Sequence, residues 1–142
     1  LNGRSYMDSC IFCKIVAGEI PCSKVYEDDD FLAFLDIRPV NHGHVLLIPR
    51  VHAVRLTDLD DRILARELPV ARRIAQAVLA ATGRTDFNLL NTNGAASGQE
   101  VFHHHLHIIP RATGDGMKLI LNPVSYADGE AAALAREIST RL

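Results

Sequence analysis

Residues 101–110 read Val-Phe-His-His-His-Leu-His-Ile-Ile-Pro, so four of the chain's seven histidines fall within five positions. The apolar flanks favour a β-strand, and a strand sends alternate side chains to opposite faces. A strand over residues 101–109 therefore places His103, His105 and His107 on one face. Phe102, His104, Leu106 and Ile108 then occupy the other face. Three buried histidines on one face would each need polar partners, so the pattern indicates a chemical site.

The composition is that of an ordinary soluble chain of 142 residues, 48% hydrophobic and 23% charged, with a net charge of −2. We expect one domain over residues 7–142, with residues 1–6 a tag remnant or an extension. The longest clean apolar run, Val45–Ile48, is too short for a membrane span, and an apolar signal core is absent. The sequence therefore predicts a cytoplasmic protein that does not enter membranes.

Charged residues on the central helix alternate in sign, which predicts a solvated face rather than a basic nucleic-acid surface. They are Arg62, Arg66, Arg72 and Arg73 among Asp60, Asp61 and Glu67. Broad nucleic-acid binding is therefore not expected.

Hydrophobic periodicity predicts five strands and one long helix. The expected strands cover residues 25–27, 31–35, 44–49, 88–92 and 101–109. The helix is expected to run from about Thr57 to Gly83, with Thr57 and Asp60 as a capping box. Pro69 is expected to kink it or mark a second start. Short loops between strands indicate an α+β fold, an antiparallel five-stranded sheet covered by this helix.

Two shorter helices are expected at the ends of the chain. One covers Cys10–Val16, and the other begins at about Asp128. The second is amphipathic and is expected to dock, on its own subunit or on a partner.

The loop over residues 93–100 reads Asn-Gly-Ala-Ala-Ser-Gly-Gln-Glu and leads directly into the histidine segment. Small residues allow backbone N–H groups to approach an oxyanion. Such a loop is usually only a turn. Beside three histidines, it predicts a phosphate site.

Cys10-x-x-Cys13 has the spacing of metal ligands, and three cysteines in a cytosolic chain favour thiols or metal over disulfides. His52 and His103 are candidates for the two further ligands that zinc would need. The alternative is a pair of thiols on the apolar side of a short helix. Cys22 has no such companion and is expected to be structural.

The segment His103–Ile109 resembles the histidine triad motif, His-φ-His-φ-His-φ-φ with φ apolar, of a superfamily of nucleotide hydrolases and transferases. Four further blocks resemble that family in order: Cys10–Ile15, Phe34–Ile37, Gly43–His52 and Asn93–Gln99. Together they cover about residues 9–112.

The resemblance implies that His105 is the nucleophile and forms a nucleotidyl-histidine intermediate. His44 and His107, with the backbone N–H of Glu100, would stabilise the α-phosphate, and His103 completes the catalytic set. Asp36 corresponds to the ribose ligand. The remaining residues expected to bind a purine nucleotide are Ile11, Phe12 and Ile37 as apolar walls, and Asn93, Gly98 and Gln99 in the loop.

In zinc-bearing members of the family, the ligands map onto Cys10, Cys13, His52 and His103. Four protein ligands close the coordination sphere, so the implied zinc is structural. The resemblance also implies a homodimer in which two sheets join edge to edge.

Two positions depart from the family pattern. His104 occupies a φ position that is usually apolar or aromatic, and we interpret it as a partly exposed residue on the core side. Glu100 stands where Ser or Thr is common, and a hydroxyl there can protonate the leaving group. The leaving-group preference is therefore left open.

The resemblance predicts a hydrolase that cleaves purine nucleoside 5′-phosphoramidates or related nucleotidyl conjugates at the α-phosphate. Dinucleoside polyphosphate hydrolysis is the second candidate. A nucleotide-binding regulatory or scaffold dimer with incidental activity is another alternative. A zinc-binding structural module without catalysis is disfavoured by the intact set His44, His105 and His107.

Overall fold

The computed structural model describes residues 9–142, so the expected tag or extension at residues 1–6 lies outside it. In chain order the elements are α2 (Ile11–Val16), β1 (Lys24–Glu27), β2 (Phe31–Leu35), β3 (Val45–Pro49), the 3-10 turn η1 (Leu56–Asp58), α3 (Asp61–Thr82), β4 (Asp86–Leu90), the 3-10 turn η2 (Ala95–Ser97), β5 (Leu106–Arg111) and α4 (Glu130–Ser139). The five strands form one antiparallel sheet in the order β1-β2-β3-β5-β4. The predicted α+β class and the five antiparallel strands are confirmed.

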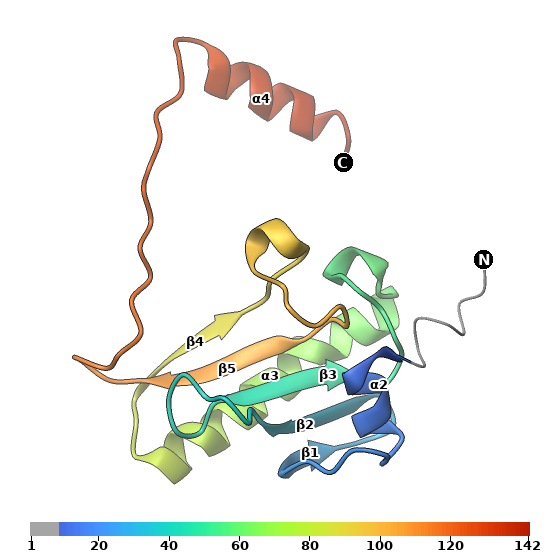
Figure 1. Cartoon of the computed structure of the whole chain (residues 1–142). Coiled ribbons are helices and arrows are strands. Elements are labelled where there is room, and N and C mark those ends of the chain that lie inside the picture. Colours follow the sequence, from blue (N-terminus) through green and yellow to red (C-terminus); the bar gives the residue numbers. More distant parts are fainter. Residues whose placement is uncertain (1–8) are drawn as a thin grey trace.

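The sheet is covered on both faces near its middle (Figure 1). One core cluster joins α3 to the sheet through residues such as Ile63, Ile74 and Ile108. A smaller cluster on the opposite face packs Phe12 of α2 against residues including Phe34. Because β2 and β3 are covered on both faces, their sequences are continuous apolar runs rather than alternating ones.

The long helix α3 begins later than the sequence predicts. Asp60 is its N-cap and its carboxylate accepts a hydrogen bond from Ile63 N at 2.9 Å, whereas Thr57 belongs to the separate turn η1. The expected Thr57 capping box is therefore wrong, because Asp60 itself satisfies the exposed amide at the helix start. The helix continues through Pro69 to a left-handed Gly83 with φ 66°, which confirms the predicted stop.

The histidine strand also begins later than predicted. β5 starts at Leu106, and the amide of His104 donates to Ala53 O at 2.6 Å instead of joining a strand ladder. The expected alternation of side chains nevertheless holds: the rings of His103 and His105 pack edge-on against Phe12, while His104 points to Glu67 on α3. The facing of the triad is thus correct and its strand boundary is wrong.

The charged face of α3 is only partly solvated. Arg62 and Arg66 form ion pairs with Asp30 at the turn between β1 and β2, and Arg66 also pairs with Asp28. Glu67 is 3% exposed, so the prediction that it lies on a solvated face is wrong. It lies four residues after buried Ile63, within the apolar stripe of the helix.

The C-terminal helix α4 does not dock on the sheet. Every residue from Lys118 to Leu142 is exposed, and Figure 1 shows α4 at the end of an extended segment away from the body. The expected helix exists, but docking on its own subunit is not observed. Within residues 9–142, no helix is both long and apolar enough to cross a membrane.

Candidate active site

His105 has one ring nitrogen, Nε2, that forms no hydrogen bond with any residue from 9 to 142. Its Nδ1 lies 2.7 Å from the carbonyl oxygen of His103, so Nδ1 carries the proton and donates it. The lone pair of the ring therefore lies on Nε2. Burial lowers the pKa of His105, although the hydrogen bond to the His103 carbonyl partly opposes this. A neutral ring with an Nε2 lone pair is a competent nucleophile near pH 7.

His44 and His107 form a directed pair beside His105. The amide of Val40 donates to His44 Nδ1 at 3.1 Å, so His44 carries its proton on Nε2. That Nε2 lies 2.9 Å from His107 Nδ1, which must accept. His107 consequently carries its proton on Nε2, where it can be donated to a ligand. The ring of His107 lies 4.8 Å from that of His105 between centroids.

The electrostatics keep this pair uncharged. Burial, with additional repulsion from His105 and His44, lowers the pKa of His107 to about 4. Burial likewise lowers the pKa of His44, and the nearby carboxylate of Asp36 partly offsets this effect. The site thus offers N–H donors to a phosphate without the cost of burying several cations.

Asp36 follows β2 at the edge of the same site. One carboxylate oxygen accepts from the backbone amide of Arg38 at 2.8 Å. The other lies 3.8 Å from His44 Nε2, and the side chain is 20% exposed. A partly open carboxylate can accept hydrogen bonds from sugar hydroxyls.

The loop before the histidines is held by its own glutamine. Gln99 Oε1 accepts from Gly94 N at 2.7 Å, and Nε2 donates to Val54 O at 2.7 Å. Gly94 and Gly98 have φ of 96° and 92°, a region that favours glycine. The buried Gln99 side chain therefore fixes the loop from inside.

A second group of side chains lies on the far side of His103. Cys13 Sγ is 3.3 Å from His52 Nδ1, Cys10 Sγ is 3.5 Å from His103 Nδ1, and the two imidazole Nδ1 atoms are 3.3 Å apart. Tetrahedral bonds of about 2.0–2.3 Å to a zinc ion require ligand atoms roughly 3.3–3.8 Å apart. The spacing therefore fits a zinc ion.

The protonation pattern of this cluster also fits a metal. His103 Nε2 lies 2.8 Å from Pro49 O and donates to it, which leaves the Nδ1 lone pair facing the cysteines. Burial, reinforced by Cys10, raises the pKa of the Cys13 thiol to about 12. Two adjacent thiolates here would need a cation.

The group Asp36, His44 and His107 also brings ligand-type atoms within 4.8 Å of one another. It does not suit a metal as arranged. The Val40 amide occupies His44 Nδ1, so a metal on Nε2 would require an imidazolate anion. The same arrangement suits a phosphate, which accepts protons rather than lone pairs.

The profile of the HIT domain family matches residues 17–114 of the chain. The chain belongs to the HIT domain family. Adenylylsulfatase HINT3 of Arabidopsis thaliana is 47% identical over 115 residues, which cover 81% of this chain and 58% of that protein. Adenosine 5′-monophosphoramidase hnt1 of Schizosaccharomyces pombe is 42% identical over 137 residues, which cover 94% of this chain and 98% of that protein.

Solved HIT structures share the fold. A HIT family protein from Bacillus subtilis superposes with a TM-score of 0.88 at 40% identity, covering 94% of this chain and 97% of that chain. A zinc-bound histidine triad protein from Mycobacterium smegmatis has a TM-score of 0.74 at 39% identity, covering 94% of this chain and 99% of that chain. The chain is thus a HIT-type hydrolase, and its particular substrate is a separate question.

The HIT site brings most of the predicted residues together, with differences among the apolar ones. Phe12 is only 5% exposed and packs edge-on against the ring of His105, so it is buried in the site rather than open to a ligand. Ile11 is 44% and Ile37 is 91% exposed, and both are open to a ligand. Their contact with a base stays a prediction.

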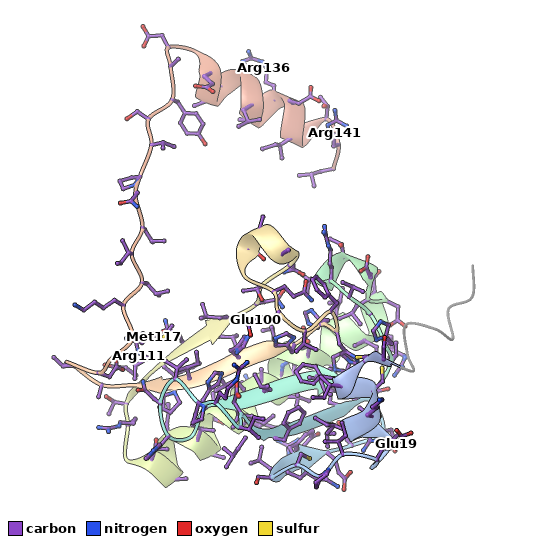
Figure 2. The ribbon with its side chains drawn as sticks, in the orientation of Figure 1. Glu19, Glu100, Arg111, Met117, Arg136 and Arg141 are labelled. Atoms are coloured by element: carbon purple, nitrogen blue, oxygen red, sulfur yellow. The ribbon has the colours of Figure 1, made fainter. Side chains whose placement is uncertain are left out.

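The predicted polar residues of the loop also differ in whether their side chains are available to a ligand. The Asn93 side chain donates to Asn91 and accepts from Leu56 N. The Gln99 side chain accepts from Gly94 N and donates to Val54 O, so both amides already have protein partners. The Glu100 side chain is 82% exposed and lies 3.5 Å from Arg38 (Figure 2). The backbone of this loop, rather than its amides, is available to a phosphate.

The structure adds residues that the sequence interpretation missed. Val40 contributes only its amide, which no side-chain motif reveals. Glu67 could have been found, because the helical period that places Ile63, Val70 and Ile74 in the core also places Glu67 there. His104, interpreted as partly exposed, is 1% exposed and bonded to Glu67.

Proposed function

We propose that this protein cleaves purine nucleoside 5′-phosphoramidates or related nucleotidyl conjugates at the α-phosphate, through a covalent nucleotidyl intermediate on His105. The observation that carries the proposal is the 2.7 Å hydrogen bond that His105 Nδ1 donates to the carbonyl oxygen of His103. It fixes the tautomer, so the free lone pair lies on Nε2.

In the first step, His105 Nε2 attacks the α-phosphorus and the bond from phosphorus to the leaving nitrogen breaks. The leaving nitrogen takes the electron pair of that bond and a proton from solvent. The ring becomes positively charged, and its Nδ1 keeps the proton that it donates to the His103 carbonyl. In the second step, water attacks phosphorus and loses one proton to solvent, which balances the proton taken up in the first step. The bond to Nε2 breaks and its electron pair returns to Nε2, so neutral His105 is restored and a nucleoside monophosphate is released.

The surrounding donors stabilise the phosphate oxygens during both steps. His107 offers Nε2–H because its Nδ1 accepts from His44. The backbone N–H of Glu100 approaches from the loop that Gln99 holds. Fixed donors of this kind need no rearrangement as charge develops. Asp36 holds the ribose, and the exposed Ile11 and Ile37 border the base.

Two observations favour a phosphorus–nitrogen substrate over a dinucleoside polyphosphate. The relative that covers nearly the whole chain is named adenosine 5′-monophosphoramidase. A polyphosphate leaving group would also bring extra negative charge toward the carboxylate of Glu100. The cation beside Glu100 is Arg38, whose Nη2 lies 3.5 Å from Glu100 Oε2. That single exposed pair offers little compensation.

The test is steady-state turnover of a fluorogenic adenosine phosphoramidate against a dinucleoside tetraphosphate, with the same enzyme preparation. We expect the phosphoramidate to have the higher kcat/KM. Preference for the tetraphosphate would favour the second candidate, and tight binding of nucleotide without turnover of either would favour a regulatory or scaffold role.

We further propose that Cys10, Cys13, His52 and His103 hold a structural zinc ion. A zinc ion with four protein ligands has no open position, so its contribution is to hold α2 against the histidine segment. The ligand-atom spacing and the protonation of His103 support this assignment. The zinc-bound relative from Mycobacterium smegmatis is consistent with it.

We also propose that the protein is a homodimer, formed at the β4 edge of the sheet. β4 is an edge strand, and Phe87 and Leu89 on it are 43% and 40% exposed beside the 60% exposed Leu68 of α3. A second copy would cover these apolar groups. Light scattering of the protein and of a Phe87→Asp variant tests this: the variant should be monomeric, and a monomeric parent protein would contradict the assignment.

A further inference from the structure

The first part of the triad lies outside the sheet. β5 pairs with β3 and β4 only from Leu106 onward, so within the described part of the chain the backbone of His103 to His105 forms no strand ladder on either side. Yet attack by His105 requires its ring to hold one orientation, because a small displacement of a nucleophile is costly. Other contacts must therefore fix this segment.

A chain of side-chain hydrogen bonds approaches the segment from the α3 side. Asn93 Nδ2 donates to Asn91 Oδ1, which orients the Asn91 amide. Asn91 Nδ2 then donates to His105 O at 2.9 Å and lies 3.4 Å from His104 Nδ1. His104 Nδ1 is thus an acceptor, so its proton lies on Nε2.

That Nε2 lies 2.7 Å from Glu67 Oε1 and donates to it. Both side chains are almost fully buried, with 0% of His104 and 4% of Glu67 exposed. Glu67 is the only buried carboxylate among residues 9–142. A buried carboxylate is costly unless it is paired, and a hydrophobic pair could fill the same volume. Its hydrogen bond to His104, the residue next to His105 in the chain, therefore calls for an explanation.

We propose that Glu67, His104 and Asn91 are positioning residues that hold the backbone of the nucleophile. Glu67 fixes the ring of His104, His104 and Asn93 fix the amide of Asn91, and Asn91 holds the carbonyl of His105. The same peptide segment carries the His103 carbonyl that sets the tautomer of His105. None of the three side chains touches the substrate, so they act through the geometry of His105.

This inference rests on the proposed phosphoramidate hydrolysis, and its test uses three variants with a matched control. Glu67→Leu removes the acceptor for His104, whereas Glu67→Gln keeps an acceptor oxygen at the same place. Asn91→Ala removes the donor to His105 O without altering α3. Val70→Ala is the control, because it removes buried volume one turn away on the same helix, where Val70 is 5% exposed.

Kinetics are measured with a fluorogenic adenosine phosphoramidate, well below the Tm of each variant. Glu67→Leu and Asn91→Ala should lower kcat by roughly 10- to 100-fold, as expected for a misplaced reacting group, and KM should change by less than about twofold. Glu67→Gln should restore most of kcat. Val70→Ala should lose Tm but keep kcat.

A second measurement does not depend on turnover. Nitrogen-15 imidazole spectra report the tautomer of His105, which should be the single Nδ1–H form in the parent protein and in Val70→Ala. Mixed tautomers are expected in Glu67→Leu and Asn91→Ala. If the parent protein does not turn over the phosphoramidate, the proposed function fails and the spectra alone decide the positioning role.

The positioning role is overturned if Glu67→Leu and Asn91→Ala keep the kcat of the parent protein, or lose no more kcat than Val70→Ala does. Where the parent protein shows no turnover, the role is overturned if the tautomer of His105 is the same in these two variants as in the parent. Should Glu67→Leu not fold, Asn91→Ala carries the same comparison, because its side chain is not part of the helix core.

Discussion

Two clusters of histidines lie at opposite ends of the triad segment, and both have the spacing of a metal site. The first joins Cys10, Cys13, His52 and His103, and the second joins Asp36, His44 and His107. They differ in where their protons lie. Pro49 O accepts a hydrogen bond from His103 Nε2–H, which leaves the Nδ1 lone pair facing the cysteines. The Val40 amide instead donates to His44 Nδ1, so the proton of His44 lies on Nε2.

Backbone groups, more than ligand spacing, therefore separate a cation site from an anion site in this protein. A carbonyl behind an imidazole directs a lone pair forward, and an amide behind it directs a proton forward. The first arrangement suits a metal and the second a phosphate. His105 also has a carbonyl behind it, that of His103, so its lone pair faces forward, and in the proposed mechanism this lone pair attacks phosphorus.

We call Cys10, Cys13, His52 and His103 the metal cluster, and Asp36, His44 and His107 the phosphate cluster. Replacing His105, which lies between them, should cause the greatest loss of turnover and leave the metal cluster intact. His105→Ala should lower turnover by about 10⁴-fold or more, because a nucleophile is lost rather than weakened. Zinc content and Tm should stay close to those of the parent protein. Quenched reactions followed by peptide mapping should locate the nucleotidyl adduct on His105 in the parent. Near-normal turnover in the variant would remove His105 from its role.

The next effect concerns the metal cluster. Changing Cys10 and Cys13 together to Ser should remove about one zinc ion per chain and lower Tm, since two of four ligands are lost. Metal analysis and thermal melting measure the two outcomes. His44→Ala provides the contrast, because it should retain zinc despite its place in a cluster of similar spacing. Full zinc retention in the double Cys variant would eliminate the proposed site.

Much of this architecture follows from local patterns in the sequence. The five strands, the long helix and the facing of the histidines could be predicted because apolar periodicity records which side of an element is buried. The metal set could be proposed because Cys-x-x-Cys and two histidines are ligand types. The family resemblance added the roles of His44 and Asp36, which no spacing rule supplies.

The parts that escaped prediction depend on backbone groups and on long-range partners. β5 begins at Leu106 rather than at the predicted residue 101. The amide of His104 donates to Ala53 O and the carbonyl of His105 accepts from Asn91, so these backbone groups do not pair with a neighbouring strand. Glu67 was assigned to solvent from its charge alone, although the helical period placed it in the core. Val40 acts through an amide that every residue except proline has.

A more moderate effect is expected at the edge of the phosphate cluster. Asp36→Asn should weaken the binding of adenosine monophosphate more than that of its 2′-deoxy form, because the lost bond to the 2′-hydroxyl is charge-assisted and contributes about 1.5–3 kcal/mol at most. Calorimetric titration with both nucleotides measures the difference. Glu100→Gln is a control for loss of a nearby charge, and equal losses with both sugars at Asp36 would contradict the ribose assignment.

The smallest expected effect is a displaced acid limb in the pH profile of kcat/KM. Attack requires an uncharged His105, and burial lowers the pKa of His105 and of His44, and that of His107 to about 4. Lowered pKa values keep the rings neutral as the pH falls through the ordinary histidine range. The limb should therefore lie below pH 6.5, the ordinary value for a histidine.

The profile should be measured from about pH 4.5 to 8, because an unshifted histidine would be only roughly one tenth neutral at pH 5.5. A larger fraction of the plateau kcat/KM than this one tenth should remain there, because burial lowers the pKa of His105 and of His44. Acid also protonates cysteine ligands and releases zinc, so metal content and circular dichroism at each pH must accompany the kinetics. A half-maximal point at or above pH 6.5, with zinc and fold intact, would show that the phosphate cluster titrates as exposed histidines do. The contrast between the two clusters would then lose its electrostatic basis.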